Sequence, residues 1–395
     1  MGVDAHVTCP LCAGRETFVF LHRPRVPVHQ NLLHETGEAA RAAVRGELEM
    51  RACPGCGFVF NGAFDSGLLE YGERYENSQN ASPVFSAYVD TLVRRLSRLS
   101  EFRSGEILEI GCGNGAFLRR LLTQPGVAAR GIGIDPAYVG PESMLGGRLR
   151  FERSLYVPGA SPSADAVVCR HVVEHVPRPL QLLRDIASAA HADQPVRIFL
   201  ETPCVEWILR GGVVWDFFYE HCSLFTPESL REALVRAGFG GVSVKRAFGD
   251  QYLCADATTA ETESPTTRDA HELVALARAR VDASTETRLA GVVAELAARG
   301  PTMIWGAGAK GATFCDIVDP DGSRLAGVVD VNLAKQGRFI PGTGHPILSP
   351  EDAVARGIMT AVVLNPNYVS EVAALLRRLG SGASVRDLTR ELRCG

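Results

Sequence analysis

The fold is decided by the stretch EILEIGCGNG, which runs from Glu106 to Gly115. Its first five residues form a short, largely apolar run that indicates a buried parallel strand, and glycines then interrupt it. Residues 116–122 have helical spacing, so the glycines lie at a strand-to-helix corner. A missing Cβ lets a ligand approach the backbone there, so the corner predicts nucleotide binding, although a corner built only for packing has the same pattern.

A second strand, residues 129–135, ends in Asp135 at about the distance from the corner where the dinucleotide fold places its ribose-binding acid. The spacing E-x-G-x-G-x-G differs from the G-x-G-x-x-G of nicotinamide enzymes, and the corner has no Walker lysine. It resembles motif I of class I S-adenosylmethionine-dependent methyltransferases. In that family the first acid lies near the methionine end of the cofactor, the glycine backbone contacts the cofactor, and the second acid holds the ribose. The resemblance implies cofactor contacts by Glu109, Gly111, Gly113, Asn114, Gly115 and Asp135.

Beyond Asp135, strands and helices continue to alternate, which predicts an α/β fold with a parallel sheet covered on both faces. Arg170 and His171 follow the fourth strand, at the edge where such sheets bind ligands, so we assign them to the cofactor site as well. We expect strands near 149–156, 164–170 and 196–200, and helices at 84–99, 180–190 and 227–237.

The whole chain has 395 residues, which suggests two or three domains. Hydrophobic residues make up 46% and charged residues 22%, and no apolar run reaches the ~18 to 20 residues of a membrane span. The N-terminus lacks a secretory pattern, so we expect a cytoplasmic protein. With a formal net charge of −4, nothing favours nucleic acid or a membrane as the partner.

Four of the eleven cysteines form two Cys-x-x-Cys pairs, Cys9 with Cys12 and Cys53 with Cys56. Four thiolates suit tetrahedral zinc, and a site filled by sulfur has no open place for water or substrate. We therefore predict a structural zinc site in an N-terminal module, with two unrelated cysteine pairs as the alternative. The insertion between the pairs carries histidines that we interpret as surface or substrate-facing: His22, His29 and His34.

A second strand and glycine turn, Met303 to Gly311, repeats the first corner, and another strand again ends in an acid, Asp330. This indicates a second Rossmann-like domain. We expect a zinc module at 1–70, a cofactor-binding methyltransferase domain at 71–260, a polar helical connector at 261–300, and the second Rossmann-like domain at 301–395.

The order of these parts resembles the C-methyltransferases that act on keto-deoxysugar nucleotides in antibiotic pathways. The resemblance is carried by the four cysteines, by Tyr219-Glu220-His221 before Phe225-Thr226, and by Lys335-Gln336-Gly337 before Pro341-Gly342-Thr343. It implies a C-terminal domain that binds the nucleotide part of the acceptor. It also implies that the active site holds His221, Glu220, His175, Tyr75 and Tyr219.

Joining a methyl group to carbon needs a base that removes a proton next to a carbonyl group. Histidine fits this work because its ordinary pKa of ~6.5 lies close to working pH. We predict that His221 is the base and that Glu220 raises its basicity. We also predict that Tyr75 belongs to a polar, aromatic loop that covers the substrate, with an ordinary connecting loop as the alternative. A Glu-His pair at His175 is equally typical of packing.

Two departures from the family are visible. Phe218 stands where the family has a tyrosine, and Tyr219 stands where it has a histidine. The acceptor is therefore left open between a sugar nucleotide and another natural-product intermediate. Methylation of oxygen or nitrogen, and a non-catalytic scaffold that binds the cofactor, remain the alternatives.

Overall fold

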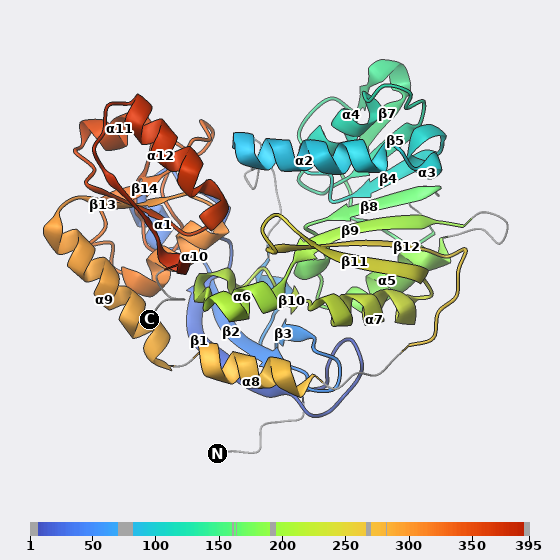
Figure 1. Cartoon of the computed structure of the whole chain (residues 1–395), viewed down its shortest axis with the longest axis horizontal. Coiled ribbons are helices and arrows are strands. Elements are labelled where there is room, and N and C mark those ends of the chain that lie inside the picture. The colour runs from blue at the N-terminus through green and yellow to red at the C-terminus, as the bar shows by residue number, and fades with distance from the viewer. Residues whose placement is uncertain are drawn as a thin grey trace.

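The computed structural model of the chain describes residues 7–69, 82–159, 162, 164–189, 195–265, 270–281 and 283–390. Within these residues the strands form three sheets, and the predicted α/β architecture is confirmed. Figure 1 shows the five-stranded and eight-stranded sheets on opposite sides of the molecule, with the N-terminal strands below and between them. The two sides of the cleft that the next section describes therefore come from different sheets.

The eight-stranded sheet has a parallel centre, in which five strands run in the order β9-β8-β4-β5-β7, and antiparallel strands at both edges. The carboxyl ends of the parallel strands meet at one edge, which is where such sheets bind ligands. In sheet order the strands are β11 (Gly240–Ala247), β12 (Tyr252–Thr258), β9 (Arg197–Pro203), β8 (Ala166–Arg170), β4 (Glu106–Ile110), β5 (Arg130–Ile134), β7 (Leu149–Glu152) and β6 (Ser143–Met144).

Helices cover both faces of this sheet, which explains why Ile107, Leu108 and Ile110 of β4 are all buried. Ile107 belongs to the hydrophobic cluster that holds α2 and α4, and Leu108 belongs to the cluster that holds α5 and α7. Thr226 is the N-cap of the α7 helix, and its side chain accepts a hydrogen bond from the backbone N–H of Ser229. The helices are α2 (Pro83–Leu96), α3 (Ser100–Ser104), α4 (Ala116–Leu122), α5 (Pro179–Ser188), α6 (Val205–Gly211) and α7 (Pro227–Ala237).

The N-terminal module contributes three strands to a four-stranded antiparallel sheet, and the fourth strand, β10, lies in the sequence between β9 and β11 of the eight-stranded sheet. The short β10 begins two residues after His221 and pairs with β3, so the module supports the segment that carries this histidine. Its elements are β1 (Phe18–Pro27), α1 (Gly37–Arg41), β2 (Arg45–Ala52), β3 (Val59–Asn61) and β10 (Ser223–Leu224), with a 3-10 helix at Ser66–Leu68.

The C-terminal sheet is parallel throughout, in the order β15-β14-β13-β16-β17, and its central strand β13 leads into the second glycine turn. Trp215, from the half that holds the eight-stranded sheet, packs edge-to-face on Phe314, with 5.3 Å between ring centroids, and thus joins the two halves. The elements are β13 (Thr302–Trp305), α10 (Ala309–Val318), β14 (Gly327–Val329), β15 (Ile347–Leu348), α11 (Pro350–Ala355), β16 (Thr360–Val363), a 3-10 helix at Pro366–Tyr368, α12 (Val369–Arg378) and β17 (Ser384–Asp387).

The segment expected to be a polar connector is helical but not merely a connector. Its two helices, α8 (His271–Arg280) and α9 (Ala283–Arg299), bury apolar side chains such as Leu273 and Leu289. The α8 helix packs against β1, β2 and α6. The predicted helices are present, and a narrow apolar stripe among the charged residues lets each of them bury one side.

Several predicted bounds were also too generous. The first long helix ends at Leu96 rather than at residue 99, and the strand expected to reach residue 156 ends at Glu152. No helix in the described ranges is long and apolar enough to span a membrane.

Candidate active site

A cavity of about 710 Å³ lies between the two halves, and both glycine corners line it. The first corner contributes Gly111, Gly113 and Asn114, and the second contributes Gly306 and Gly308. The sequence predicted each corner separately. The structure brings them to one shared space.

The three glycines of the first corner have left-handed φ angles but serve different purposes. A Cβ atom on Gly111 would lie 2.1 Å from a methyl carbon of Val172, and one on Gly115 would lie 2.3 Å from the ring of Phe151. These two glycines are needed for packing. A Cβ atom on Gly113 would meet nothing within 4 Å, so this is where the backbone leaves room for a ligand.

Asp135, at the end of β5, closes the corner from the other side. Its Oδ2 atom accepts a hydrogen bond from the backbone N–H of Gly113 at 2.8 Å, and its Oδ1 atom accepts one from Ala137 at 2.7 Å. Both residues line the cavity next to Asn114. The carboxylate is thus held at the position from which a ribose could be bound.

Glu109 is a buried carboxyl group at the carboxyl end of β4, with only 2% of its surface exposed. Burial raises its pKa to about 8. Its Oε2 atom has no hydrogen-bond partner among the residues that the structure describes, although the side chain lines the cavity. An orphaned buried carboxyl group that faces a cavity fits a cationic ligand, such as the ammonium and sulfonium groups of S-adenosylmethionine.

Arg170 and His171 also line the cavity, and both are held by Glu201. The Nε of Arg170 donates to Glu201 at 2.6 Å, and its guanidinium lies 4.3 Å from the ring centroid of Phe117. His171 has a φ of 53°, which is uncommon for a residue other than glycine. Such strained residues gather at functional sites, and this one turns the chain after β8 into the cavity wall.

Two imidazoles and a carboxylate meet in the cavity wall next to His171, whose Nδ1 atom lies 3.3 Å from Oε1 of Glu174. The rings of His175 and His221 meet edge-to-face with 4.8 Å between centroids, and one ligand atom each of Glu174, His175 and His221 lies within 4.8 Å of the others. Burial lowers the pKa of His221 well below its ordinary value, and the nearby charges of His175, His171 and Lys310 lower it further. His221 is therefore a neutral imidazole that can accept a proton.

The second corner repeats the geometry of the first. The backbone N–H of Ala307 donates to Oδ2 of Asp330 at 2.7 Å, and a Cβ atom on Gly306 would meet nothing within 4 Å. Two lysines flank this corner. Lys310 forms an ion pair with Asp216 of the methyltransferase half, and Lys335 donates to the carbonyl of Ala307 at 3.1 Å.

Comparison with known proteins assigns both halves. A family profile described as a methyltransferase domain matches residues 85–244, and a profile described as a C-methyltransferase C-terminal domain matches residues 257–383. The C-methyltransferase NovU of Streptomyces niveus is 24% identical, over 92% of this chain and 90% of its own. The protein is an S-adenosylmethionine-dependent methyltransferase, and its C-terminal half matches the C-terminal domain of C-methyltransferases.

Solved structures also resemble this methyltransferase in part. One is an S-adenosylmethionine-dependent methyltransferase from Mesorhizobium loti, 16% identical with a TM-score of 0.35, which covers 44% of this chain and 99% of its own. Another is the 1,6-didemethyltoxoflavin-N1-methyltransferase of Burkholderia thailandensis, 18% identical with a TM-score of 0.33, over 47% of this chain and 80% of its own.

Glu220 does not lie beside the imidazole of His221, as the sequence suggested, but contacts the N-terminal module. It is fully buried, and its two oxygens are used by the N-terminal module: Nδ1 of His29 lies 3.3 Å from one, and the backbone N–H of Gln30 donates to the other at 3.0 Å. The carboxylate grouped with His221 is Glu174. This corrects the expectation that Glu220 orients the base, and it places His29 in the interior rather than against the substrate.

Tyr219 also needs correction. Its ring fills the space above Gly46, and its hydroxyl donates to the carbonyl of Asp65 at 3.1 Å, away from the residues that line the cavity. Its neighbour Phe218 lines the cavity instead and packs 4.0 Å from the ring centroid of His221. Tyr75 lies outside the described residues.

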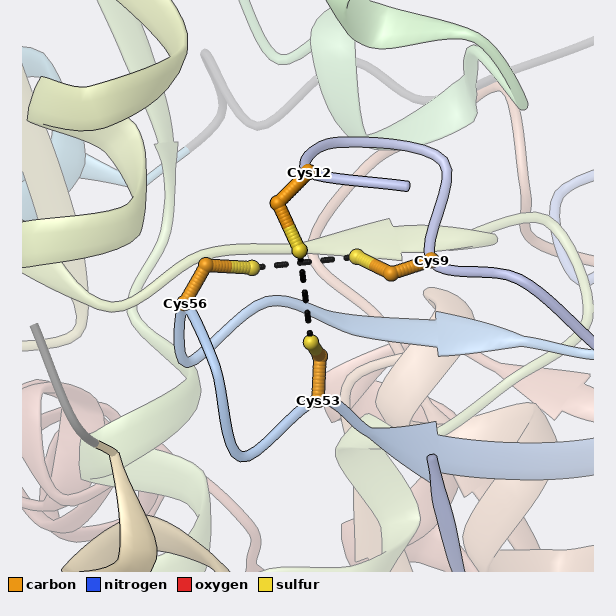
Figure 2. A group of neighbouring side chains, drawn as sticks. All are labelled: Cys9, Cys12, Cys53 and Cys56. Atoms are coloured by element: carbon orange, nitrogen blue, oxygen red, sulfur yellow. Dashed lines mark hydrogen bonds between the residues drawn. The ribbon is translucent and has the colours of Figure 1, made fainter. Parts of the chain in front are cut away.

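The four cysteines of the methyltransferase converge as predicted, from two turns of the N-terminal module (Figure 2). The Sγ atoms of Cys9 and Cys56 lie 3.7 Å apart, and those of Cys12 and Cys53 lie 3.6 Å apart. Zn–S bonds of about 2.3 Å in a tetrahedron place the sulfurs about 3.8 Å apart. The donor set and its spacing therefore fit zinc.

Sequence reasoning missed three residues that face the cavity. Glu174 stood beside a predicted histidine, Lys310 lay inside a quoted glycine turn, and Asp216 had no local signal at all. Only the first two could have been selected from the sequence.

Proposed function

We propose that this methyltransferase transfers the methyl group to a carbon next to a carbonyl, through an enolate that His221 generates. The observation that carries the proposal is the neutral imidazole of His221 in a cavity that two nucleotide-binding corners share. Only the neutral form of an imidazole can accept a proton. Because a carbon-bound proton is weakly acidic, its removal also depends on the position of the base and on stabilisation of the enolate.

The first corner fits the cofactor. In this proposal Asp135 holds the ribose, the backbone at Gly113 and Asn114 lies along the cofactor, and Glu109 pairs with its cationic end. Gly111, Gly115, Arg170 and His171 shape the surrounding wall. S-adenosylmethionine, when bound, supplies an electrophilic methyl group.

The base acts from the wall of the same cavity. His221 takes the proton, and Phe218 packs against its ring with 4.0 Å between the ring centroids. The ring of His175 meets that of His221 edge-to-face, and the Nδ1 atom of His175 is buried without a hydrogen-bond partner in the described part of the chain. This nitrogen can therefore bind the acceptor or exchange the proton with it.

The second corner supports a nucleotide sugar as the acceptor. The free space at Gly306, the N-terminus of α10 and the carboxylate of Asp330 form the arrangement that binds a phosphate and a ribose. NovU, named as a C-methyltransferase, supports carbon as the methylated atom. An acceptor held at this corner would present its sugar to the shared cavity.

The four cysteines, in this proposal, hold a structural zinc that stabilises module 1–70 beneath a methyltransferase domain at 71–260 and a substrate-binding domain at 301–395. Thiols that stay free for a metal suit the reducing cytoplasm, which we propose as the location.

The experiment uses a thymidine-diphospho-4-keto-6-deoxyhexose and S-adenosylmethionine with a ¹³C-labelled methyl group. The proposal expects a product whose labelled methyl is coupled to carbon in the NMR spectrum. A methyl group found on oxygen or nitrogen would overturn it.

A further inference from the structure

Lysine is rare in this chain, and its use at the cavity calls for an explanation. Lysine and arginine together number 41, yet lysine occurs only at Lys245, Lys310 and Lys335. Lys245 is exposed on β11, whereas the other two line the cavity at the second glycine corner. Two of the three lysines therefore lie at the second glycine corner, whereas arginine supplies almost every other positive charge of the chain. A lysine ammonium is more compact than an arginine guanidinium.

The side chain of Lys310 links the two halves of the protein through an ion pair with Asp216. It lies in the first turn of α10, and its ammonium is bound by both carboxylate oxygens of Asp216, in the 3-10 helix Val214–Asp216. It also lies 5.4 Å from the ring centroid of Trp207. An ammonium has three protons, so one remains to be donated to a ligand after Asp216 has accepted two.

The other lysine and arginine side chains of the cavity wall also have partners of their own. Arg170 is bound to Glu201, Arg120 donates to Ser86, and Lys335 donates to a backbone carbonyl. Lys310 lines the cavity together with its partner Asp216 and with His221, and its charge contributes to the lowered pKa of that imidazole. The ammonium and the base thus line one cavity.

We propose that Lys310 is a catalytic residue that donates a hydrogen bond to the carbonyl oxygen of the acceptor and stabilises the enolate. As the C–H bond breaks, the proton goes to the ring nitrogen of His221 and the electron pair forms a carbon-carbon double bond. The carbonyl π pair moves onto oxygen, where the ammonium of Lys310 offsets the new negative charge. Asp216 positions the ammonium. This inference rests on the proposed carbon methylation.

A catalytic role for Lys310 gives the C-terminal half a part in the chemistry that His221 begins. The methyltransferase half alone would hold the cofactor and His221 but would lack the cation that the enolate needs. The active site is therefore composite, and a charge held in place by protein groups stabilises a developing charge without having to reorient.

The test compares Lys310→Met with the matched control Lys245→Met in the full-length protein. The readout is the exchange of the acceptor α-proton with deuterium from solvent, using the same keto-sugar nucleotide without S-adenosylmethionine. We expect exchange to slow by roughly 10² to 10³ in Lys310→Met, as for the loss of an oxyanion donor, and to be unchanged in Lys245→Met. Lys310→Arg, which keeps the charge, should recover part of the rate.

Two further readouts separate catalysis from folding. Titration with S-adenosylmethionine should give the wild-type affinity for Lys310→Met, and the acid limb of its kcat/KM profile should move to higher pH, because removal of the ammonium raises the pKa of His221. Wild-type exchange in Lys310→Met would overturn the role of Lys310 alone. The lack of exchange in the wild type would overturn the proposed carbon methylation itself.

Discussion

The imidazole of His221 meets that of His175 edge-to-face, with 4.8 Å between their ring centroids. Burial, and then the nearby charge of His175, lowers the pKa of His221 well below its ordinary value. The lowered pKa favours the neutral ring, which is the form that can take a proton from carbon.

His221→Ala should lose the base while it keeps the fold of the cofactor corner. We expect methylation and cofactor-independent deuterium exchange to fall together by roughly 10² to 10⁴. Titration calorimetry should show S-adenosylmethionine affinity within a few-fold of the wild type. If methylation survives in His221→Ala and is abolished in His175→Ala, the base is His175.

The lowered pKa of His221 also makes stability depend on pH. The unfolded chain binds a proton at this residue below pH ~6.5, whereas the folded chain does not, so its contribution to stability is present above that pH and is lost as pH falls. Urea unfolding of wild type and His221→Gln should show a smaller loss of stability on acidification in the variant. Equal slopes for the two proteins would show that His221 is not buried as a neutral imidazole.

Local patterns predicted the parts of this site that depend on spacing along the chain. The glycine corner and the two cysteine turns are of this kind, since backbone geometry alone sets them. Partners far apart in sequence were not accessible in this way: Asp216 and Lys310 are separated by 94 residues, and His29 and Glu220 by 191. Glu220 was misassigned because adjacent residues on an irregular segment point in different directions, so that it faces the N-terminal module while His221 faces the cavity.

Glu109 should couple cofactor binding to pH. Its pKa of about 8 keeps the carboxyl group mostly protonated at neutral pH, and a cationic ligand favours the ionised form. Binding of S-adenosylmethionine should therefore release a proton, and its affinity should rise as pH approaches about 8. Calorimetry in buffers of different ionisation enthalpy measures the release.

The variant that tests this coupling is Glu109→Gln. It should bind S-adenosylmethionine more weakly than the wild type at pH 8, and its affinity should no longer depend on pH. Glu106→Gln, at the start of the same strand and partly exposed, is the matched control. Proton release that persists in Glu109→Gln would assign the coupling to another group.

Zinc is predicted to bind once per chain, at the four cysteines. Protein purified without added metal should contain one zinc, and Cys53→Ser should lose it together with a fall in Tm, because metal binding free energy contributes to folding of the module. Cys222→Ser, which removes a buried thiol outside the cluster, should keep the metal. Substoichiometric zinc in the wild type with no further loss in Cys53→Ser would contradict the assignment.

The two glycine corners allow a crossed test of which ligand each one binds. Asp135 and Asp330 accept equivalent backbone hydrogen bonds, at 2.8 and 2.7 Å, so their replacement by alanine perturbs the two corners in the same way. Loss of a charged hydrogen-bond acceptor should weaken the ligand of that corner by about 10- to 100-fold. Asp135→Ala should weaken S-adenosylmethionine and spare the sugar nucleotide, whereas Asp330→Ala should do the reverse. Because each variant is the control for the other, a general loss of folding would weaken both ligands in both variants, and an exchanged pattern would reverse the assignment of the corners.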